Sequence, residues 1–341
     1  MIAFLISAIK IIILLGVLIT IHELGHFIVA KWCNVKVNEF AIGFGPKIWQ
    51  KEGKETKYTL RLIPLGGYNS LEGEEGDSQD DRAFSNASIL KRIAIVIAGA
   101  TVNIIFAIVL YFTLASLLED VYISNEIDSV IDGYPAQMIG LQQGDKIIQI
   151  NDNNIKDNID LNKSINKSNG EEVKIKVERN GKILEYSVKP TLVPINESIE
   201  MYYIGVNLKP AEDTFFNHLA KGVKMTKEFM ISIVDSLKQL FSGKVGINQM
   251  MGPVGISQVI AKTNGISEFF EMMALISLSL GVTNLLPLPA WDGGKILILL
   301  IEGIRRKPLK PQTEINLQLM GFAFLIALSI IVTYKDIVKI F

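Results

Sequence analysis

The sequence has little cysteine, little histidine and no excess of charge of either sign. One residue of 341 is a cysteine, Cys33, so no disulfide can form within the chain. The 34 Lys and Arg residues balance 35 Asp and Glu residues, which argues against nucleic acid as a partner. Only 3 histidines occur, and two of them, His22 and His26, are four residues apart. A pair so placed in a chain so poor in histidine needs a specific explanation.

Apolar residues, in contrast, are abundant. They make up 49% of the chain, and the mean hydropathy is +0.33, which indicates a membrane protein in contact with the lipid bilayer. A helix needs about 20 residues to cross the hydrocarbon layer. Four apolar stretches are long enough, at about 11–30, 93–118, 269–286 and 317–334. The first has no small-residue cleavage site before the histidines, so we expect it to be retained rather than removed as a signal peptide.

Lysine and arginine are frequent in the segment between the first two spans and in that between the last two. Short loops rich in these residues stay in the cytoplasm. The sequence therefore predicts a multi-pass plasma-membrane protein with loops 31–92 and 291–316 in the cytoplasm. Both termini and the long segment between the second and third spans are expected outside.

The outer segment has two parts. Residues 119–209 alternate between apolar and polar, as in V-K-I-K-V at 173–177, with a turn signal at Asn180-Gly181. This pattern predicts a small soluble domain rich in strands. In residues 213–243 the apolar residues recur at helical spacing, which predicts an amphipathic helical connector over residues 210–267. The connector could lie on the membrane surface or pack on the outer domain.

Residues 35–72 combine glycine and proline with β-branched and aromatic residues, which predicts β-hairpins near or dipping into the inner face. The fold class expected is therefore an α-helical polytopic membrane protein with about four transmembrane helices, a membrane-associated β-hairpin region and one inserted α+β domain. The predicted parts are 1–118 with the first two spans, 119–209 outside, 210–267 as connector, and 268–341 with the last two spans.

The segment His22-Glu23-Leu24-Gly25-His26 fits the pattern H-E-x-x-H. On a helix, positions i and i+4 share one face, so both imidazoles can reach one metal ion while Glu23 activates its water. Ionisable residues inside a span are costly and indicate function by default. The alternative is that the two histidines and the glutamate only satisfy one another within a bundle. The position within the first span favours a metal site.

Catalytic zinc usually takes three protein ligands and keeps one position for water. The third ligand must come from elsewhere, and the candidates are His218, Glu302 and Asp292. His218 falls in the outer segment, on the wrong side of the predicted topology. Glu302 stands near Arg305 and Arg306, where an ion pair is the better explanation.

Asp292 lies in a segment built to interrupt a helix. Pro287 and Pro289 break the third span, and Gly293-Gly294 allows a sharp turn directly after the aspartate. A carboxylate at a broken helix end at membrane depth suits a metal ligand. The alternative is an aspartate in an ordinary turn at the inner face.

With these motifs in place, the chain resembles the bacterial site-2-type intramembrane zinc metalloproteases of regulated proteolysis. H-E-L-G-H and the P-x-P-x-x-D-G-G element are the two defining motifs of that family. Further matches occur in the right order over nearly the whole chain, at 43–46, 63–68, 83–103 and 252–256. Two positions depart from the family pattern. Trp291 stands where leucine is usual, and Ala100 where proline is common.

The resemblance implies a zinc metalloendopeptidase with bound Zn²⁺, held by His22, His26 and Asp292, and with Glu23 as general base. Its substrates would be single-span membrane proteins or peptides, such as anti-sigma factors or remnant signal peptides, cut in or near their transmembrane segments. It also implies that Asn284, and with less force Asn103, bind substrate. The oligomeric state stays open at this point.

Residues 134–151 resemble an element of bacterial PDZ domains, in which Pro135 opens a short helix and Ile147 and Ile150 are buried in a strand. PDZ domains commonly accept peptides by strand addition. Within the family, such an outer domain would exclude large substrates. Another class of function is a catalytically inactive membrane scaffold that presents this domain. A third class is an ion transporter. Such a protein is expected to contain two repeated halves, but the His-Glu pattern occurs once, which argues against this class.

Overall fold

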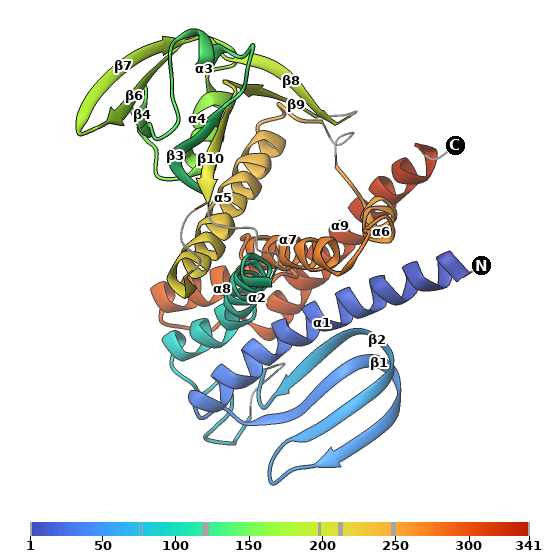
Figure 1. Cartoon of the computed structure of the whole chain (residues 1–341). Helices are drawn as coiled ribbons and strands as arrows, with labels where there is room; N and C mark the ends of the chain where they lie inside the picture. The colour runs from blue at the N-terminus through green and yellow to red at the C-terminus, as the bar shows by residue number, and fades with distance from the viewer. Residues whose placement is uncertain are drawn as a thin grey trace. The chain divides into compact units, whose positions relative to one another are not determined.

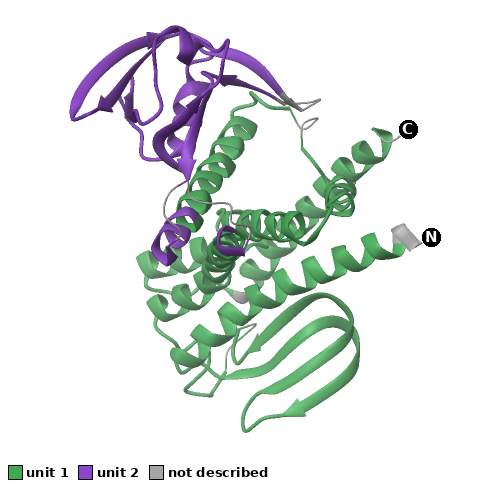
Figure 2. Cartoon of the chain, in the orientation of Figure 1, with its two compact units in different colours: residues 1–114, 222–341 green, residues 115–221 purple. Residues whose placement is uncertain are grey.

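The protein is described by a computed structural model that covers residues 2–74, 76, 78–117, 123–196, 199–210, 214–246 and 250–339. The chain forms two compact units (Figure 2). Residues 1–114 and 222–341 make the first, which holds the long helices and a curved sheet (Figure 1). Residues 115–221 make the second.

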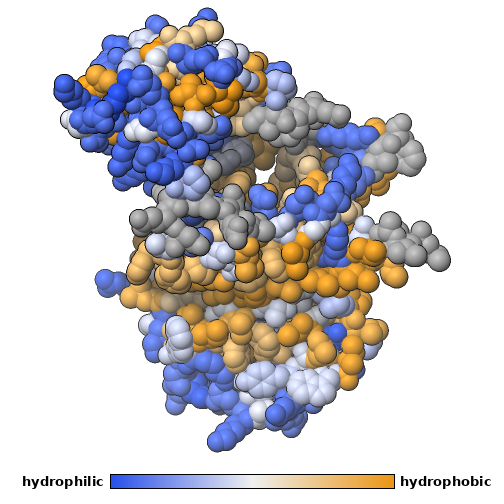
Figure 3. All heavy atoms as spheres, viewed as in Figure 1, coloured by the Kyte–Doolittle hydropathy of each residue, from blue (hydrophilic) through white to orange (hydrophobic). Residues whose placement is uncertain are grey.

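Within the described residues, four helices are long and apolar enough to cross a membrane. They are α1 (Ile2–Trp32), α2 (Ile89–Leu117), α7 (Ile266–Asn284) and α9 (Pro311–Val338). Large apolar side chains such as Met320, Phe324 and Ile330 stay exposed on this unit, as expected for helices that contact lipid. Figure 3 shows apolar residues as a band across the visible face of the helices. The polytopic membrane fold and its four spans are confirmed.

Glycine lets α1 and α2 approach each other closely at the level of the H-E-x-x-H motif. A Cβ on Gly25 would lie 2.5 Å from the carbonyl oxygen of Ala98, so only glycine fits. One to two turns earlier on α1, Leu18 is fully buried in a cluster with Ala107 of α2. The histidine-bearing part of α1 is therefore held directly against α2.

A non-helical segment that contains Pro287 and Pro289 separates α7 from α8 (Asp292–Arg305). A Cβ on Gly293 or Gly294 would lie 2.2 or 2.3 Å from a carbonyl oxygen of this same segment, so the turn requires both glycines. Asp292 becomes the first residue of α8. The predicted helix end before Asp292 is confirmed, but Gly293 and Gly294 lie in the first turn of α8, so the chain turns before the aspartate and not after it.

β1 (Val37–Glu52) and β2 (Lys57–Leu71) form the curved sheet beside α1 (Figure 1). The bends lie at glycines with positive φ, namely Gly43, Gly45 and Gly66. Because both strands fold over, Phe40 is paired with Asn69 as well as with Tyr58. β2 packs along α1. The β-hairpin region predicted for residues 35–72 is confirmed.

The second unit has the α+β architecture predicted for this part of the chain. Its sheet has the order β10-β3-β4-β6-β7, with β5 paired to β4, and a separate pair is formed by β8 and β9. The elements are β3 (Ile123–Val130), α3 (Pro135–Met138), β4 (Lys146–Ile150), β5 (Asn153–Asn154), α4 (Asn158–Lys167), β6 (Val173–Arg179), β7 (Lys182–Val188), β8 (Thr191–Asn196), β9 (Ile199–Tyr203) and β10 (Val206–Pro210). Ile147 and Ile150 are fully buried, as expected. Asn180 and Gly181 both have positive φ, as a two-residue hairpin turn requires.

Two further helices follow the strands of the second unit. α5 (Phe215–Phe241) continues into the first unit, and α6 (Pro253–Ala261) comes next. α6 is tied to the first and last spans. The Gly255 N–H donates to the Asp336 carboxylate of α9 at 2.7 Å, and just after α6 the Thr263 carbonyl accepts from Lys10 of α1 at 2.7 Å. Within the stretch expected to connect the outer domain to the third span, Phe215–Phe241 and Pro253–Ala261 are thus helical.

Candidate metal centre

Three side chains from distant parts of the chain converge between α1 and α8. Nε2 of His22 lies 3.2 Å from Oδ2 of Asp292, and Nε2 of His26 lies 3.6 Å from the same oxygen. The two Nε2 atoms are 3.2 Å apart. One ligand atom from each residue therefore faces a common point, as the spacing on α1 and the break before α8 predict.

Contacts with α2 leave the Nε2 atoms of both imidazoles free to act as ligands. Nδ1 of His26 lies 2.8 Å from the carbonyl oxygen of Ile95, to which only an Nδ1–H can donate. Nδ1 of His22 lies 3.3 Å from the side-chain amide of Asn103, whose Oδ1 has no partner among the described residues. With the amide turned, Oδ1 accepts from Nδ1–H of His22 and gains the partner that it otherwise lacks. Both imidazoles then carry their lone pair on Nε2.

The donor set fits a zinc ion. Oδ2 of Asp292 is buried and accepts no hydrogen bond within the part of the chain that the structure describes. A carboxylate oxygen that faces two imidazole lone pairs is unfavourable unless a cation lies between them. Two imidazole nitrogens and one carboxylate oxygen are a ligand set that catalytic zinc takes in other proteins. His22, His26 and Asp292 are thus the residues that would hold it.

The side chain of Glu23 faces the same space. It lines a cavity of about 250 Å³ together with both histidines, Asp292 and Asn69. Its Oε2 accepts a hydrogen bond from Nδ2 of Asn69 at 2.8 Å. The carboxylate is therefore held at a cavity that also contains the metal-binding atoms, which is where a general base must lie.

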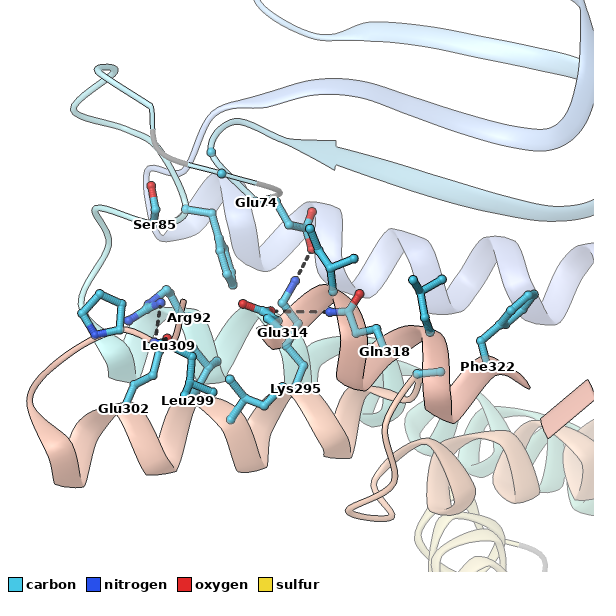
Figure 4. Close-up of a pocket in the computed structure, with 18 residues that line it drawn as sticks. Glu74, Ser85, Arg92, Lys295, Leu299, Glu302, Leu309, Glu314, Gln318 and Phe322 are labelled. Atoms are coloured by element: carbon cyan, nitrogen blue, oxygen red, sulfur yellow. Dashed lines mark hydrogen bonds and ion pairs between the residues drawn. The ribbon is translucent and has the colours of Figure 1, made fainter. Parts of the chain in front are cut away.

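A larger cavity of about 660 Å³ adjoins this one and is lined by α8, α9 and the segment after β2 (Figure 4). The two cavities share Glu74, Phe84 and Lys295. Lys295 forms an ion pair with Glu74, and its Nζ lies 4.9 Å from the centre of the Phe84 ring. This ion pair stands at the boundary between the space beside the metal ligands and the larger cavity.

Glu302, one of the alternative ligands, is in an ion pair, but its partner differs from the expected one. Its carboxylate lies 3.1 Å from Nη1 of Arg92 on α2. Glu302 is only 5% exposed, whereas Arg305 and Arg306 are exposed. The sequence suggested the nearby arginines because they are local. The structure selects Arg92 because the buried face of α8 packs near the start of α2.

The remaining candidates are placed as follows. His218 belongs to the second unit and is not in the described group of possible metal ligands. Asn284 ends α7 and is not among the described residues that line the cavity beside His22. Asn103 is fully buried behind His22. Asn69 was missed by sequence reasoning, although it directly follows the I-P-L-G-G-Y run that marks β2.

Helices that can cross a membrane, a histidine pair one turn apart, a carboxylate from a broken helix and an adjacent glutamate together define a membrane-embedded metalloprotease. The chain belongs to peptidase family M50, whose family model matches residues 10–328. The resemblance drawn from the motifs is thereby confirmed, and the protein is a zinc metalloprotease of the site-2 type.

Relatives cover almost the whole chain. A Clostridium acetobutylicum protein named a zinc metalloprotease is 40% identical over 95% of both chains. The zinc metalloprotease RasP of Oceanobacillus iheyensis is 29% identical over 98% of this chain and 99% of its own. Among solved structures, the PDZ domain of an SdrC-like protein from Listeria monocytogenes is 28% identical, covering 26% of this chain and 88% of its own, with a TM-score of 0.22.

Gly99 of α2 gives a direct test of the metal centre. A Cβ at this position would lie 2.4 Å from Nε2 of His26 and 2.7 Å from Cε1 of His22, so Gly99→Ala must displace the imidazoles. We expect the affinity for zinc to fall roughly 10–100-fold, as when the support of a metal ligand is lost. Gly303→Ala is the control, since its Cβ would meet nothing closer than 3.5 Å. Competition with a chelator measures the affinity, and an unchanged value in Gly99→Ala would contradict the placement of the metal.

Proposed function

We propose that this protein is an intramembrane metalloendopeptidase that hydrolyses peptide bonds in or near the transmembrane segments of single-span membrane proteins. One observation carries the proposal. The atoms that would bind zinc, and the carboxylate of Glu23 beside them, lie on or next to helices long and apolar enough to cross a membrane. A peptide bond that reaches this cavity must come from a chain within or beside the bilayer.

Each residue of the site has a distinct role in this reaction. Zinc, when bound, supplies a Lewis acid that polarises the scissile carbonyl and acidifies a water molecule. Glu23 accepts the proton of the attacking water and delivers it to the nitrogen of the leaving amine. His22, His26 and Asp292 hold the metal, and the two α2 groups, the Ile95 carbonyl and the Asn103 amide, orient the imidazoles.

The substrate would enter in an extended form. A helix protects its own peptide bonds by hydrogen bonding, so a transmembrane substrate must unwind locally before it can be cut. β2 lines the cavity with Tyr68, Asn69 and Leu71, which supports binding of the unwound segment alongside this strand. Asn284 stays a predicted ligand of the substrate backbone. For Asn103 we propose orientation of His22 in place of the substrate role, because it is fully buried.

Anti-sigma factors and remnant signal peptides, the substrates that the family resemblance implies, have the required single span. The second unit would lie outside the cell and limit the size of what enters the site, in line with the resemblance of residues 134–151 to a PDZ element. Both chain termini would lie on the same outer side, and loops 31–92 and 291–316 in the cytoplasm. The lysine and arginine of the two loops support this orientation.

Glu23→Gln separates catalysis from metal binding. We expect the purified variant to keep its zinc, because the three ligands are unchanged, and to cleave a model single-span substrate roughly 10²–10⁴-fold more slowly. Glu178→Gln, an exposed position on β6, is the control and should cleave like the wild type. Equal rates for Glu23→Gln and wild type would remove the proposed base. Wild-type protein without zinc and without cleavage would instead favour the inactive scaffold.

The orientation is tested with single cysteines in a Cys33→Ser background. Asp152 and Gly76 are both exposed, the first in the second unit and the second in the loop after β2. We expect a membrane-impermeant thiol reagent to label a cysteine at position 152 in intact cells, and one at 76 only after the membrane is opened. The reverse pattern would overturn the proposed topology.

A further inference from the structure

Asn69 of β2 makes two hydrogen bonds to one residue of the site. Its Nδ2 lies 2.8 Å from Oε2 of Glu23 and 2.7 Å from the main-chain oxygen of the same residue. A single side-chain amide therefore spans the Glu23 side chain from its backbone to its carboxylate. Asn69 thus contacts the proposed general base directly, in addition to lining the cavity beside it.

The orientation of the Asn69 amide follows from its partner. Nδ2 is a donor and a carboxylate only accepts, so the NH₂ group must face an ionised Glu23. If the amide were turned, its oxygen would face the carboxylate and the two would repel each other. Oδ1 of Asn69 is buried and has no partner among the described residues, so no other contact of this structure fixes the amide. The interaction with Glu23 is what determines its position.

The strand that carries Asn69 is held tightly at this point. Two residues earlier, a Cβ on Gly67 would lie 3.3 Å from Cγ of Glu23 and 2.9 Å from the carbonyl oxygen of Ala41. Across the sheet, Asn69 is paired with Phe40 of β1. A strand fixed against Glu23 in this way can position a side chain more accurately than a loop can.

Glu23 needs such support because of its neighbours and its length. A glutamate has three rotatable side-chain bonds, and Glu23 follows directly after a proposed metal ligand. Without a second contact its carboxylate could swing onto the metal, since carboxylate oxygens are themselves zinc ligands. A general base works only within about 2.6–3.2 Å of the proton that it accepts. A donor that holds the carboxylate to one side keeps it from binding the metal. The same donor keeps the carboxylate within reach of the proton that it accepts.

We propose that Asn69 is a positioning residue for the general base. It acts through Glu23, and the inference rests on the proposed function of that residue. β2 thereby takes part in catalysis as well as in the accommodation of substrate. The contribution is expected in the rate of the chemical step, because the hydrogen bond keeps the carboxylate in the place where it receives the proton.

The first experiment removes the donor while keeping the size of the side chain. Asn69→Leu should retain a full complement of zinc and a KM close to that of the wild type, while kcat for a model single-span substrate falls on the order of 10–100-fold. Asn38→Leu is the matched control. Asn38 lies on the same sheet, and its Nδ2 donates to Oε2 of Glu72 at 2.9 Å, outside the cavity that Glu23 lines. It should leave kcat unchanged.

The second experiment shortens one side chain of the pair and lengthens the other, so that their combined length is kept. It introduces no apolar residue. Glu23→Asp shortens the base by one methylene, and Asn69→Gln lengthens the amide by one. Each single variant should lose activity, and the double variant should recover part of the kcat lost by Glu23→Asp. A double variant no faster than Glu23→Asp would overturn the proposal. So would an Asn69→Leu protein with wild-type kcat, or one that has lost its zinc.

These outcomes are separate from those that test the proposed function. If Glu23→Gln cleaves as fast as wild type, the general base itself is wrong. If Glu23→Gln is inactive while Asn69→Leu has full kcat, the base stands and only the positioning role fails.

Discussion

Two imidazoles of an apolar helix and a carboxylate at the start of a neighbouring helix that face one another need a cation between them. Oδ2 of Asp292 lies 3.2 and 3.6 Å from the two imidazole nitrogens and accepts no hydrogen bond in the described part of the chain. Placing these polar groups at membrane depth is costly unless they are paired. A shared zinc ion removes that cost and creates the reactive centre at the same time. The rest of the fold serves to bring the three groups together.

Two backbone features bring the ligands together and a third places β2 beside them, and each depends on glycine or proline. Gly25 lets α1 touch α2, so that α2 can hold both imidazoles from behind through Ile95 and Asn103. The segment with Pro287 and Pro289 separates α7 from α8, and Gly293 and Gly294 let the first turn of α8 pack closely against it, directly after Asp292. The folded-over β2 then passes the open side of the site. Helices supply the metal ligands, whereas a strand supplies the contact to the base.

The parts of the site that could be predicted are those that local sequence encodes. The i, i+4 spacing of His22 and His26 puts both on one helix face, and the prolines and glycines around Asp292 mark a helix end. The four spans follow from hydropathy in the same way. In contrast, the pairing of Asn69 with Glu23 depends on how β2 lies against α1, and that of Glu302 with Arg92 on how α8 lies against α2. No local sequence pattern predicts how these elements pack against one another. The buried position of Asn103 likewise became visible only once α1 and α2 were packed together.

The most direct test of this account is the coordination of zinc in the purified protein, measured by X-ray absorption spectroscopy. We expect one zinc ion with two imidazole nitrogens and one carboxylate oxygen from the protein, all at about 2.0–2.2 Å. Asp292→Ala should change the oxygen shell and weaken zinc binding, while both imidazoles remain. A spectrum that shows fewer than two imidazoles, or one that Asp292→Ala leaves unchanged, would contradict the convergence of α1 and α8 on one metal ion.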